Sequence, residues 1–258
     1  MDDAPTPRQT APPPPGEAAA RQVIPRPLEH RPGGPARWAD LPVARRRPIA
    51  LAAVRAAVAS RPDRAPDDGG AAALVQGWIG AQVAGNPSSV LVPLFEEDGD
   101  TRVVLTVRSS SLRSHRNEVA FPGGRLDPGE ETVHGALREA EEEVGLDAGL
   151  VEVVGRLTSM PTVSSNTLMT PVVSVLGGRP ASLRPNPGEV ERIFDVALSD
   201  LVADGVFHEE WWTVPGRAGG EFPVWFFDAG GEIIWGATAR ILVELLCLAL
   251  GVGDPFVR

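Results

Sequence analysis

The sequence predicts an α/β fold in which helices cover a mixed β-sheet. Two observations favour this class. Runs rich in β-branched and aromatic residues outnumber the amphipathic helical patterns, and the helical patterns are interspersed among these strand-like runs. A chain of 258 residues has room for one substantial core with extensions, and it is short for two independent enzymes.

The first 45 residues are rich in Pro, Arg and Ala and show little apolar periodicity. Such a stretch cannot bury enough apolar surface to offset its ordering entropy, so we expect a disordered tail over residues 1–45. A binding role for the prolines at 12–15 is the alternative. We expect one domain over residues 46–258, opening with a helix at about 48–60 whose first turn contains Pro48.

The remaining elements follow from hydrophobic periodicity and turn residues. Helices are expected at 132–144 and 237–250. A turn-like segment at 96–100 joins the first two strands. The expected strands are 89–95, 102–107, 151–154, 171–176, 190–196, 224–228 and 232–235.

Charge and cysteine content bear on the cellular compartment and the partners of the protein. Residues 69–258 carry 13 arginines and 26 acidic residues, a net charge of −13, so the folded part should repel nucleic acid. The single cysteine, Cys247, lies in an apolar run, where we expect a buried thiol in a reducing compartment. No run reaches the roughly 18–20 apolar residues of a membrane span, and the N-terminus shows no signal pattern. We therefore expect a cytoplasmic protein without membrane contact.

Three glutamates on one expected helix carry the main chemical signal. Glu139, Glu142 and Glu143 are three and four residues apart, so their carboxylates share a face. Each like-charge pair at this spacing costs about 0.2–0.5 kcal/mol, and the C-terminal half of a helix disfavours negative charge. A divalent cation would resolve this conflict, and Mg²⁺ suits carboxylates together with substrate phosphates. A solvated acidic face is the alternative interpretation of these glutamates alone.

The glutamates belong to a longer pattern, in which Asp127-Pro128-Gly129 predicts a turn before the helix and Gly145 predicts its end. Gly124 is followed after five residues by Glu130, and after seven more by Arg138-Glu139-Ala140. Glu142-Glu143 and Gly145-Leu146 then follow, each after one intervening residue. This pattern resembles the Nudix box of Nudix hydrolases at every defined position. The resemblance implies a Nudix fold, a mixed β-sheet sandwiched between α-helices, in which the box forms a loop-helix-loop.

The resemblance also implies roles within the box. Glu139, Glu142 and Glu143 would coordinate Mg²⁺ or Mn²⁺, and Glu130 would assist them. Arg138 would orient the carboxylates through ion pairs. The metal would neutralise a diphosphate while a carboxylate acts as general base on the attacking water.

The general base has three candidates. Two of them, Glu142 and Glu143, lie in the box, and the third, Glu189, enters the strand expected at 190–196. An exposed acid at the strand edge is the alternative for Glu189. We find only scattered serines without a histidine–carboxylate set, so covalent catalysis is not expected.

A second resemblance, over about residues 88–250, narrows the substrate. The segment 105–124, together with 185–190 and 234–239, is similar to the extended motif of coenzyme A diphosphatases. It implies cleavage of coenzyme A to 3′,5′-ADP and 4′-phosphopantetheine, with Gly123 and Gly124 among the substrate-binding positions.

A cationic cluster precedes the box on this otherwise acidic chain. The planar guanidinium of arginine matches the geometry of phosphate. Arg108, Arg113 and His115 are therefore expected to bind substrate phosphates, including the 3′-phosphate of coenzyme A. Alternatively, the arginines pair with the acidic helix and the histidine is structural. Two positions depart from the motif, which usually has glycine at Asn117 and commonly glutamine at Glu118. Asparagine tolerates left-handed backbone, whereas the glutamate adds negative charge near an anionic substrate.

Rival functions remain open from the sequence. Another diphosphate, such as a nucleoside diphosphate sugar, a dinucleotide or an RNA cap, would use the same box. A catalytically silent nucleotide-binding module is the rival from another class, although every metal-ligand position of the box is present. The oligomeric state is also open, with a homodimer as one option.

Overall fold

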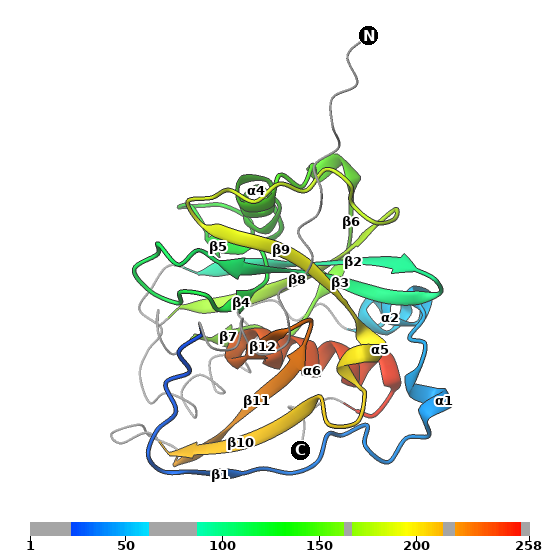
Figure 1. Cartoon of the computed structure of the whole chain (residues 1–258). Helices are drawn as coiled ribbons and strands as arrows, with labels where there is room; N and C mark the ends of the chain where they lie inside the picture. Colours follow the sequence, from blue (N-terminus) through cyan, green and yellow to red (C-terminus); the bar gives the residue numbers. More distant parts are fainter. Residues whose placement is uncertain (1–21, 62–86, 163–166, 214–219, 254–258) are drawn as a thin grey trace, which may run out of the picture.

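The computed structural model describes residues 22–61, 87–162, 167–213 and 220–253, and its central feature is a mixed main sheet (Figure 1). Five strands follow the order β4-β3-β2-β8-β6, while β5 pairs with β2, β7 with β8 and β9 with β3. The β2–β8 pair is parallel and the other pairs are antiparallel. The strands are β2 Ser88–Glu97, β3 Asp100–Arg108, β4 Val119–Ala120, β5 Gly123–Arg125, β6 Val151–Arg156, β7 Met160–Pro161, β8 Leu168–Leu176 and β9 Val190–Ala197.

A second sheet of four antiparallel strands lies below the main sheet in Figure 1. Its order is β1-β10-β11-β12, and its strands are β1 His30–Pro32, β10 Phe207–Thr213, β11 Glu221–Ala229 and β12 Glu232–Trp235. The expected strands at 224–228 and 232–235 are confirmed as parts of β11 and β12. The sequence did not predict β10, in which the two half-buried acids Glu209 and Glu210 are adjacent and are followed by two adjacent tryptophans.

Helices cover both faces of the main sheet. The helix α4, Thr132–Val144, packs on one face, and α2, Leu51–Ala59, and α6, Gly236–Leu250, pack on the other (Figure 1). The remaining short helices are α1 Val43–Arg46, the 3₁₀ turn η1 Ala148–Leu150 and α5 Leu198–Leu201. This is the α/β Nudix-type sandwich that the sequence predicts.

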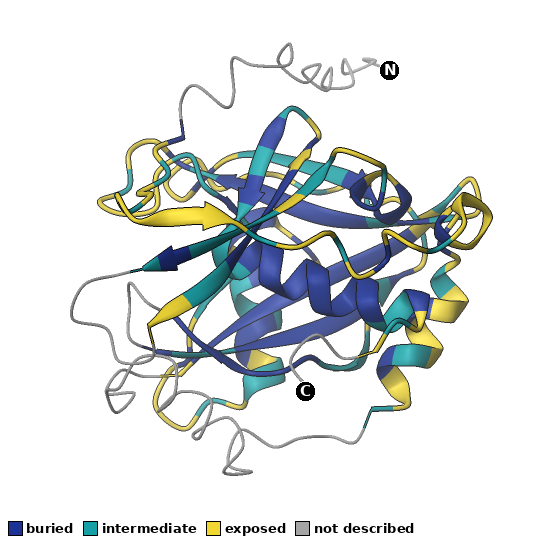
Figure 2. Ribbon diagram, turned by 90° about the horizontal axis from the view of Figure 1, so that it is seen from below, coloured by how far each residue is buried: buried dark blue, intermediate teal, exposed yellow. Residues whose placement is uncertain are grey.

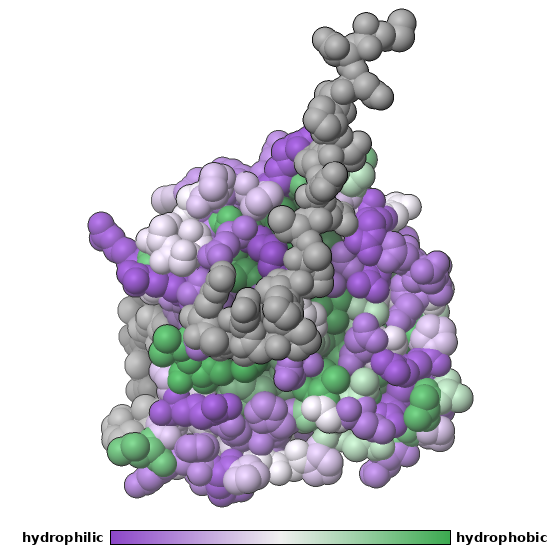
Figure 3. All heavy atoms as spheres, viewed as in Figure 1, coloured by the Kyte–Doolittle hydropathy of each residue, from purple (hydrophilic) through white to green (hydrophobic). Residues whose placement is uncertain are grey.

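Side-chain alternation along β2 separates two cores. Leu91 and Phe95 point toward α4, whereas Val90, Val92 and Leu94 belong to the cluster shared with α2 and α6. Most residues of α6 are buried in the interior of the molecule (Figure 2). Hydrophobic residues reach the surface mainly in a band between the two sheets, and hydrophilic residues dominate the rest of the face in Figure 3.

The N-terminal segment departs from the expected tail. Residues 1–21 lie outside the described residues, but residues 22–45 pack against the domain. The strand β1 pairs with β10, and Trp38 is only 2% exposed, with its ring 5.3 Å from that of Phe207 and 6.3 Å from that of Phe227. The composition of the segment could not predict that Trp38 is buried, because the residues that bury it are distant in the sequence. The ordered domain therefore begins before residue 46.

Three smaller expectations can be compared directly with the structure. The helix expected at about 48–60 is present as α2, but it begins at Leu51 with Ala50 as its N-cap, so Pro48 precedes the helix and is not in its first turn. Cys247 is buried, as expected. In the described part of the chain, no helix has the length and apolarity needed to cross a membrane.

Candidate active site

The predicted loop-helix-loop is present between β5 and η1. The turn at Asp127 is closed by the backbone N–H of Glu130, which donates to the Asp127 carbonyl at 2.9 Å. The Asp127 N–H in turn donates to Oε2 of Glu130 at 2.9 Å, so the glutamate folds back toward α4. Gly145 ends the helix with a left-handed φ of 66°, as the sequence predicts.

Arg138 connects the carboxylates of the box. Its guanidinium donates to both oxygens of Glu130, at 2.9 and 3.0 Å. It also lies 3.1 Å from Oε1 of Glu139 and 3.2 Å from Oε2 of Glu142. The Arg138 hydrogen bonds, aided by the Asp127 N–H, lower the pKa of Glu130 to about 2. Arg138 therefore offsets the repulsion that three acidic side chains would create on one helix face.

Glu143 is the most buried acid of the box, with 3% of its surface exposed. It accepts a hydrogen bond from the Gly123 N–H at 3.1 Å, and Nη1 of Arg108 lies 3.8 Å from its Oε1. Burial, which disfavours the charged form, raises the pKa of Glu143 to about 7. Burial also raises the pKa of the half-buried Glu139.

The two glycines of the loop create the space that the carboxylates occupy. A Cβ atom at Gly124 would lie 2.6 Å from Oε2 of Glu139, well inside ordinary van der Waals contact. A Cβ atom at Gly123 would lie 2.6 Å from Cα of Val90. Gly123 thus allows close packing of the loop against β2, and Gly124 leaves room for the Glu139 carboxylate, roles that the sequence did not reveal.

The NUDIX domain model matches residues 85–216, which is half of the chain and contains the whole of this site. The chain belongs to the Nudix family.

Three relatives extend this Nudix assignment. The uncharacterized Nudix hydrolase NudL of Photorhabdus laumondii is 39% identical over 159 residues, 61% of this chain and 82% of that protein. The chloroplastic Nudix hydrolase 22 of Arabidopsis thaliana is 42% identical over 61% of this chain, but the chain covers only 53% of that protein. The peroxisomal coenzyme A diphosphatase NUDT7 of Mus musculus is 38% identical over 68% of this chain and 75% of that protein. This Nudix protein is a hydrolase that acts on phosphorus anhydrides.

The cationic loop between β3 and β4 begins beside the Nudix carboxylates. Arg108 ends β3 next to Glu143, whereas Arg113 is exposed and makes no hydrogen bond or ion pair with any described residue. His115 and Asn117 have left-handed φ angles of 57° and 58°, so asparagine does take the geometry that glycine would favour. Nδ1 of His115 lies 2.8 Å from Oε2 of Glu118, and this contact raises the pKa of the histidine. When His115 is protonated, this contact counters the negative charge of Glu118.

Glu189 lies at the rim of the same Nudix site. Its side chain is exposed, and its charge adds to the effect of burial in raising the pKa of Glu139 and Glu143. Its carbonyl accepts from the Ser109 N–H at 2.8 Å, which ties it to the loop after β3. The Asn186 N–H donates to the Glu143 carbonyl at 2.8 Å and joins this segment to the end of α4.

The Nudix carboxylates fit a hard divalent cation, because all of their ligand atoms are oxygens. Within the residues that the structure describes, no three Asp, Glu, His or Cys side chains converge on a common point suited to an ion. The contacts explain this arrangement, since Arg138 attracts Glu139 and Glu142 while Glu143 turns to the Gly123 N–H. The three glutamates share one face of α4, so side-chain rotation would let them converge.

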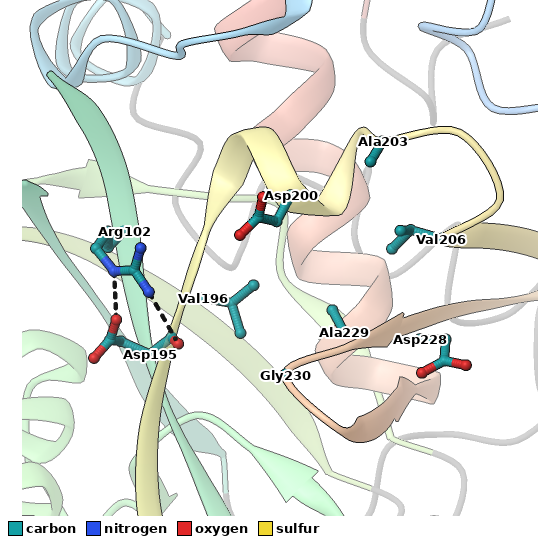
Figure 4. A pocket seen from close by; sticks show the side chains of 9 residues that line it. All are labelled: Arg102, Asp195, Val196, Asp200, Ala203, Val206, Asp228, Ala229 and Gly230. Atoms are coloured by element: carbon teal, nitrogen blue, oxygen red, sulfur yellow. Dashed lines mark hydrogen bonds and ion pairs between the residues drawn. The ribbon is translucent and has the colours of Figure 1, made fainter. Parts of the chain in front are cut away.

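A separate cavity of about 400 Å³ lies at the opposite end of β3 and β9 (Figure 4). Arg102 and Asp195 on its wall pair with each other, and Asp200 and Asp228 face it from α5 and β11. Arg102 precedes Arg108 by six residues on β3, which places the cavity roughly 20 Å from the Nudix glutamates. None of those glutamates lines it.

The sequence analysis missed one polar residue beneath the Nudix helix. Ser89 on β2 is fully buried, and its hydroxyl has no hydrogen-bond partner among the described residues. A serine near the start of a strand gives no sequence signal, because only its pairing with Gly124 brings it to the site.

Proposed function

We propose that this Nudix hydrolase cleaves the diphosphate of coenzyme A or its derivatives, giving 3′,5′-ADP and 4′-phosphopantetheine. The observation that carries this proposal is the position of the cationic loop, which starts with Arg108 3.8 Å from Glu143. Coenzyme A has a 3′-phosphate in addition to its diphosphate. The guanidinium of Arg113 is exposed, has no partner among the described residues and could bind this phosphate. The 38% identity to the mouse coenzyme A diphosphatase supports the same substrate.

Hydrolases of this family generally depend on divalent metal ions, and we assign Mg²⁺ or Mn²⁺ to the carboxylate face of α4. Glu139, Glu142 and Glu143 would hold the ion, and Glu130 would contribute through its two hydrogen bonds to Arg138. A cation bound there would neutralise the diphosphate and lower the pKa of an attacking water. Arg138 would keep the carboxylates oriented toward the substrate.

A carboxylate beside the diphosphate would accept the proton of the attacking water. Glu142 is the most exposed of the four glutamates assigned to the ion, with 57% of its side chain accessible, and Glu143 lies beside Arg108. Glu189 approaches from the β9 side and remains the third candidate for the base. The Gly123 N–H holds Glu143 in place, and Gly123 and Gly124 leave room for the substrate phosphates to approach the loop.

The test is incubation of the protein with coenzyme A and Mg²⁺, followed by chromatographic detection of 3′,5′-ADP. We expect product formation that Glu142→Gln abolishes and that Glu141→Gln, an exposed acid on the same helix, leaves intact. Turnover of a nucleoside diphosphate sugar, a dinucleotide or an RNA cap without turnover of coenzyme A would overturn the substrate. Binding of coenzyme A without turnover of any of these would favour the silent binding module.

Two further proposals concern the setting of the protein. We place it in the cytoplasm, since its single cysteine is buried and reduced, although the relatives include chloroplastic and peroxisomal proteins. Fractionation of cells expressing the full chain tests this location. A homodimer is the second proposal, and light scattering on the purified protein measures it.

A further inference from the structure

Ser89 is the cross-strand partner of Gly124, the residue against which the carboxylate of Glu139 packs. It pairs with Gly124 across the antiparallel β2–β5 ladder, and the Cβ positions of such partners are about 4.5–5.5 Å apart on the same face of the sheet. A Cβ at Gly124 would lie 2.6 Å from Oε2 of Glu139. The carboxylate therefore rests over Gly124, within reach of the neighbouring serine.

The hydroxyl of Ser89 points toward α4. A Cβ atom at Gly135, in the second turn of that helix, would lie 3.2 Å from Oγ of Ser89 and 3.1 Å from Oε2 of Glu130. The hydroxyl thus lies in the space beneath the box that Gly135 leaves open, next to the space at Gly124 that the Glu139 carboxylate occupies. It is fully buried and donates to none of the described residues.

An unpaired buried hydroxyl is costly, because folding removes its hydrogen bonds to water. Here Oε1 of Glu139 faces Arg138 at 3.1 Å instead of the serine. A carboxylate that binds a cation through one oxygen still has lone pairs to satisfy on the other. Carboxylates that ligate metals are usually fixed by such a second hydrogen bond.

We propose that Ser89 is a positioning residue, whose hydroxyl donates a hydrogen bond to Glu139 when the box holds its divalent cation. This inference rests on the metal site proposed above. It assigns to Ser89 a role in cation affinity and none in the stability of the cation-free fold.

The chain offers a matched control in Ser174. This serine on β8 is also fully buried, and its hydroxyl also lacks a hydrogen-bond partner in the described part of the chain. It pairs with Pro93, four residues along β2 from Ser89, which places it roughly 13 Å from the box. Removal of either hydroxyl should have the same effect on the cation-free fold.

The experiment is a Mn²⁺ titration of the full chain, in which electron paramagnetic resonance measures the free ion. We expect Ser89→Ala to raise the dissociation constant on the order of 10-fold, as loss of an outer-shell partner does. Ser174→Ala should leave the constant unchanged, and in EDTA neither variant should unfold at a lower urea concentration than the wild type. Ser89→Cys, which keeps a weak donor of similar size, should fall between wild type and Ser89→Ala.

Wild-type affinity in Ser89→Ala, or equal weakening in both alanine variants, would overturn the positioning role. If Ser89→Ala does not fold, affinity of Ser89→Cys equal to wild type would overturn it instead. A wild-type protein that binds Mn²⁺ but leaves coenzyme A intact would overturn the proposed substrate and not this inference. Absence of Mn²⁺ binding by the wild type would overturn the metal site and the role of Ser89 together.

Discussion

Replacement of Gly124 by alanine should separate catalysis from folding. The new Cβ would lie 2.6 Å from Oε2 of Glu139, whereas ordinary contacts begin at 3.4 Å. The carboxylate must therefore retreat by about 1 Å, a displacement that can cost on the order of 100-fold in rate. The obstacle is the far end of a flexible side chain, so the backbone can stay in place. We expect kcat to fall about 100-fold with little change in the urea midpoint.

Alanine substitutions at two other glycines serve as comparisons that can refute the Gly124 prediction. Gly123→Ala would place Cβ 2.6 Å from Cα of Val90, where the backbone must move, so stability should fall by about 1–3 kcal/mol. Gly177→Ala has no atom within 4 Å of its Cβ and should behave as wild type. Turnover and urea unfolding are measured for all three variants. Wild-type kcat in Gly124→Ala, or a loss of stability equal to that of Gly123→Ala, would refute the proposed approach of Glu139.

Three further predictions follow from the contacts. Arg113→Ala should reduce kcat/KM for coenzyme A about 10–100-fold, the value of one charge-assisted hydrogen bond, while turnover of 3′-dephospho-coenzyme A changes little; equal losses would exclude a 3′-phosphate contact. Trp38→Ala should lower the free energy of unfolding by about 3–5 kcal/mol, and Leu28→Ala, which is fully exposed in the same segment, should not; equal urea midpoints would contradict packing of residues 22–45. Since folding lowers the pKa of Glu130 from 4.5 to about 2, its stabilising effect is complete above pH 4.5 and is lost as the pH falls toward 2. The difference in urea midpoint between wild type and Glu130→Gln should shrink over that range, and a constant difference would contradict the Arg138 pair.

Local sequence patterns were enough to predict the helix of the box, the turn before it and the glycine that ends it. The apolar stripe of α4, the turn at Asp127 and the left-handed Gly145 each depend on residues within a few positions, and all three are present. The ion pairs of Arg138 also join residues on one helix and its preceding loop. Chemistry that a short segment carries can be predicted from that segment.

What the sequence did not reveal depends on pairing between distant segments. Trp38 becomes part of the core only because β10 and β11 bring Phe207 and Phe227 to it. Ser89 reaches the box only through its register with Gly124, and a shift of one residue would turn it to the other face. The second sheet was recognised only in part, since half-buried acids in β10 interrupt the alternation that predicts a strand.

Arg138 explains how an acidic helix face can exist before any cation binds. Arg138 donates hydrogen bonds to both carboxylate oxygens of Glu130, and this pair holds the guanidinium beside Glu139 and Glu142. The arginine neutralises those two carboxylates with single, partly exposed contacts, which are weaker than the bidentate anchor. A divalent cation that attracts them would therefore compete with contacts of low strength, while the anchor to Glu130 keeps Arg138 in place. The folded protein therefore stabilises the clustered carboxylates mainly through Arg138, and a cation bound in the proposed site would exchange without rearrangement of α4.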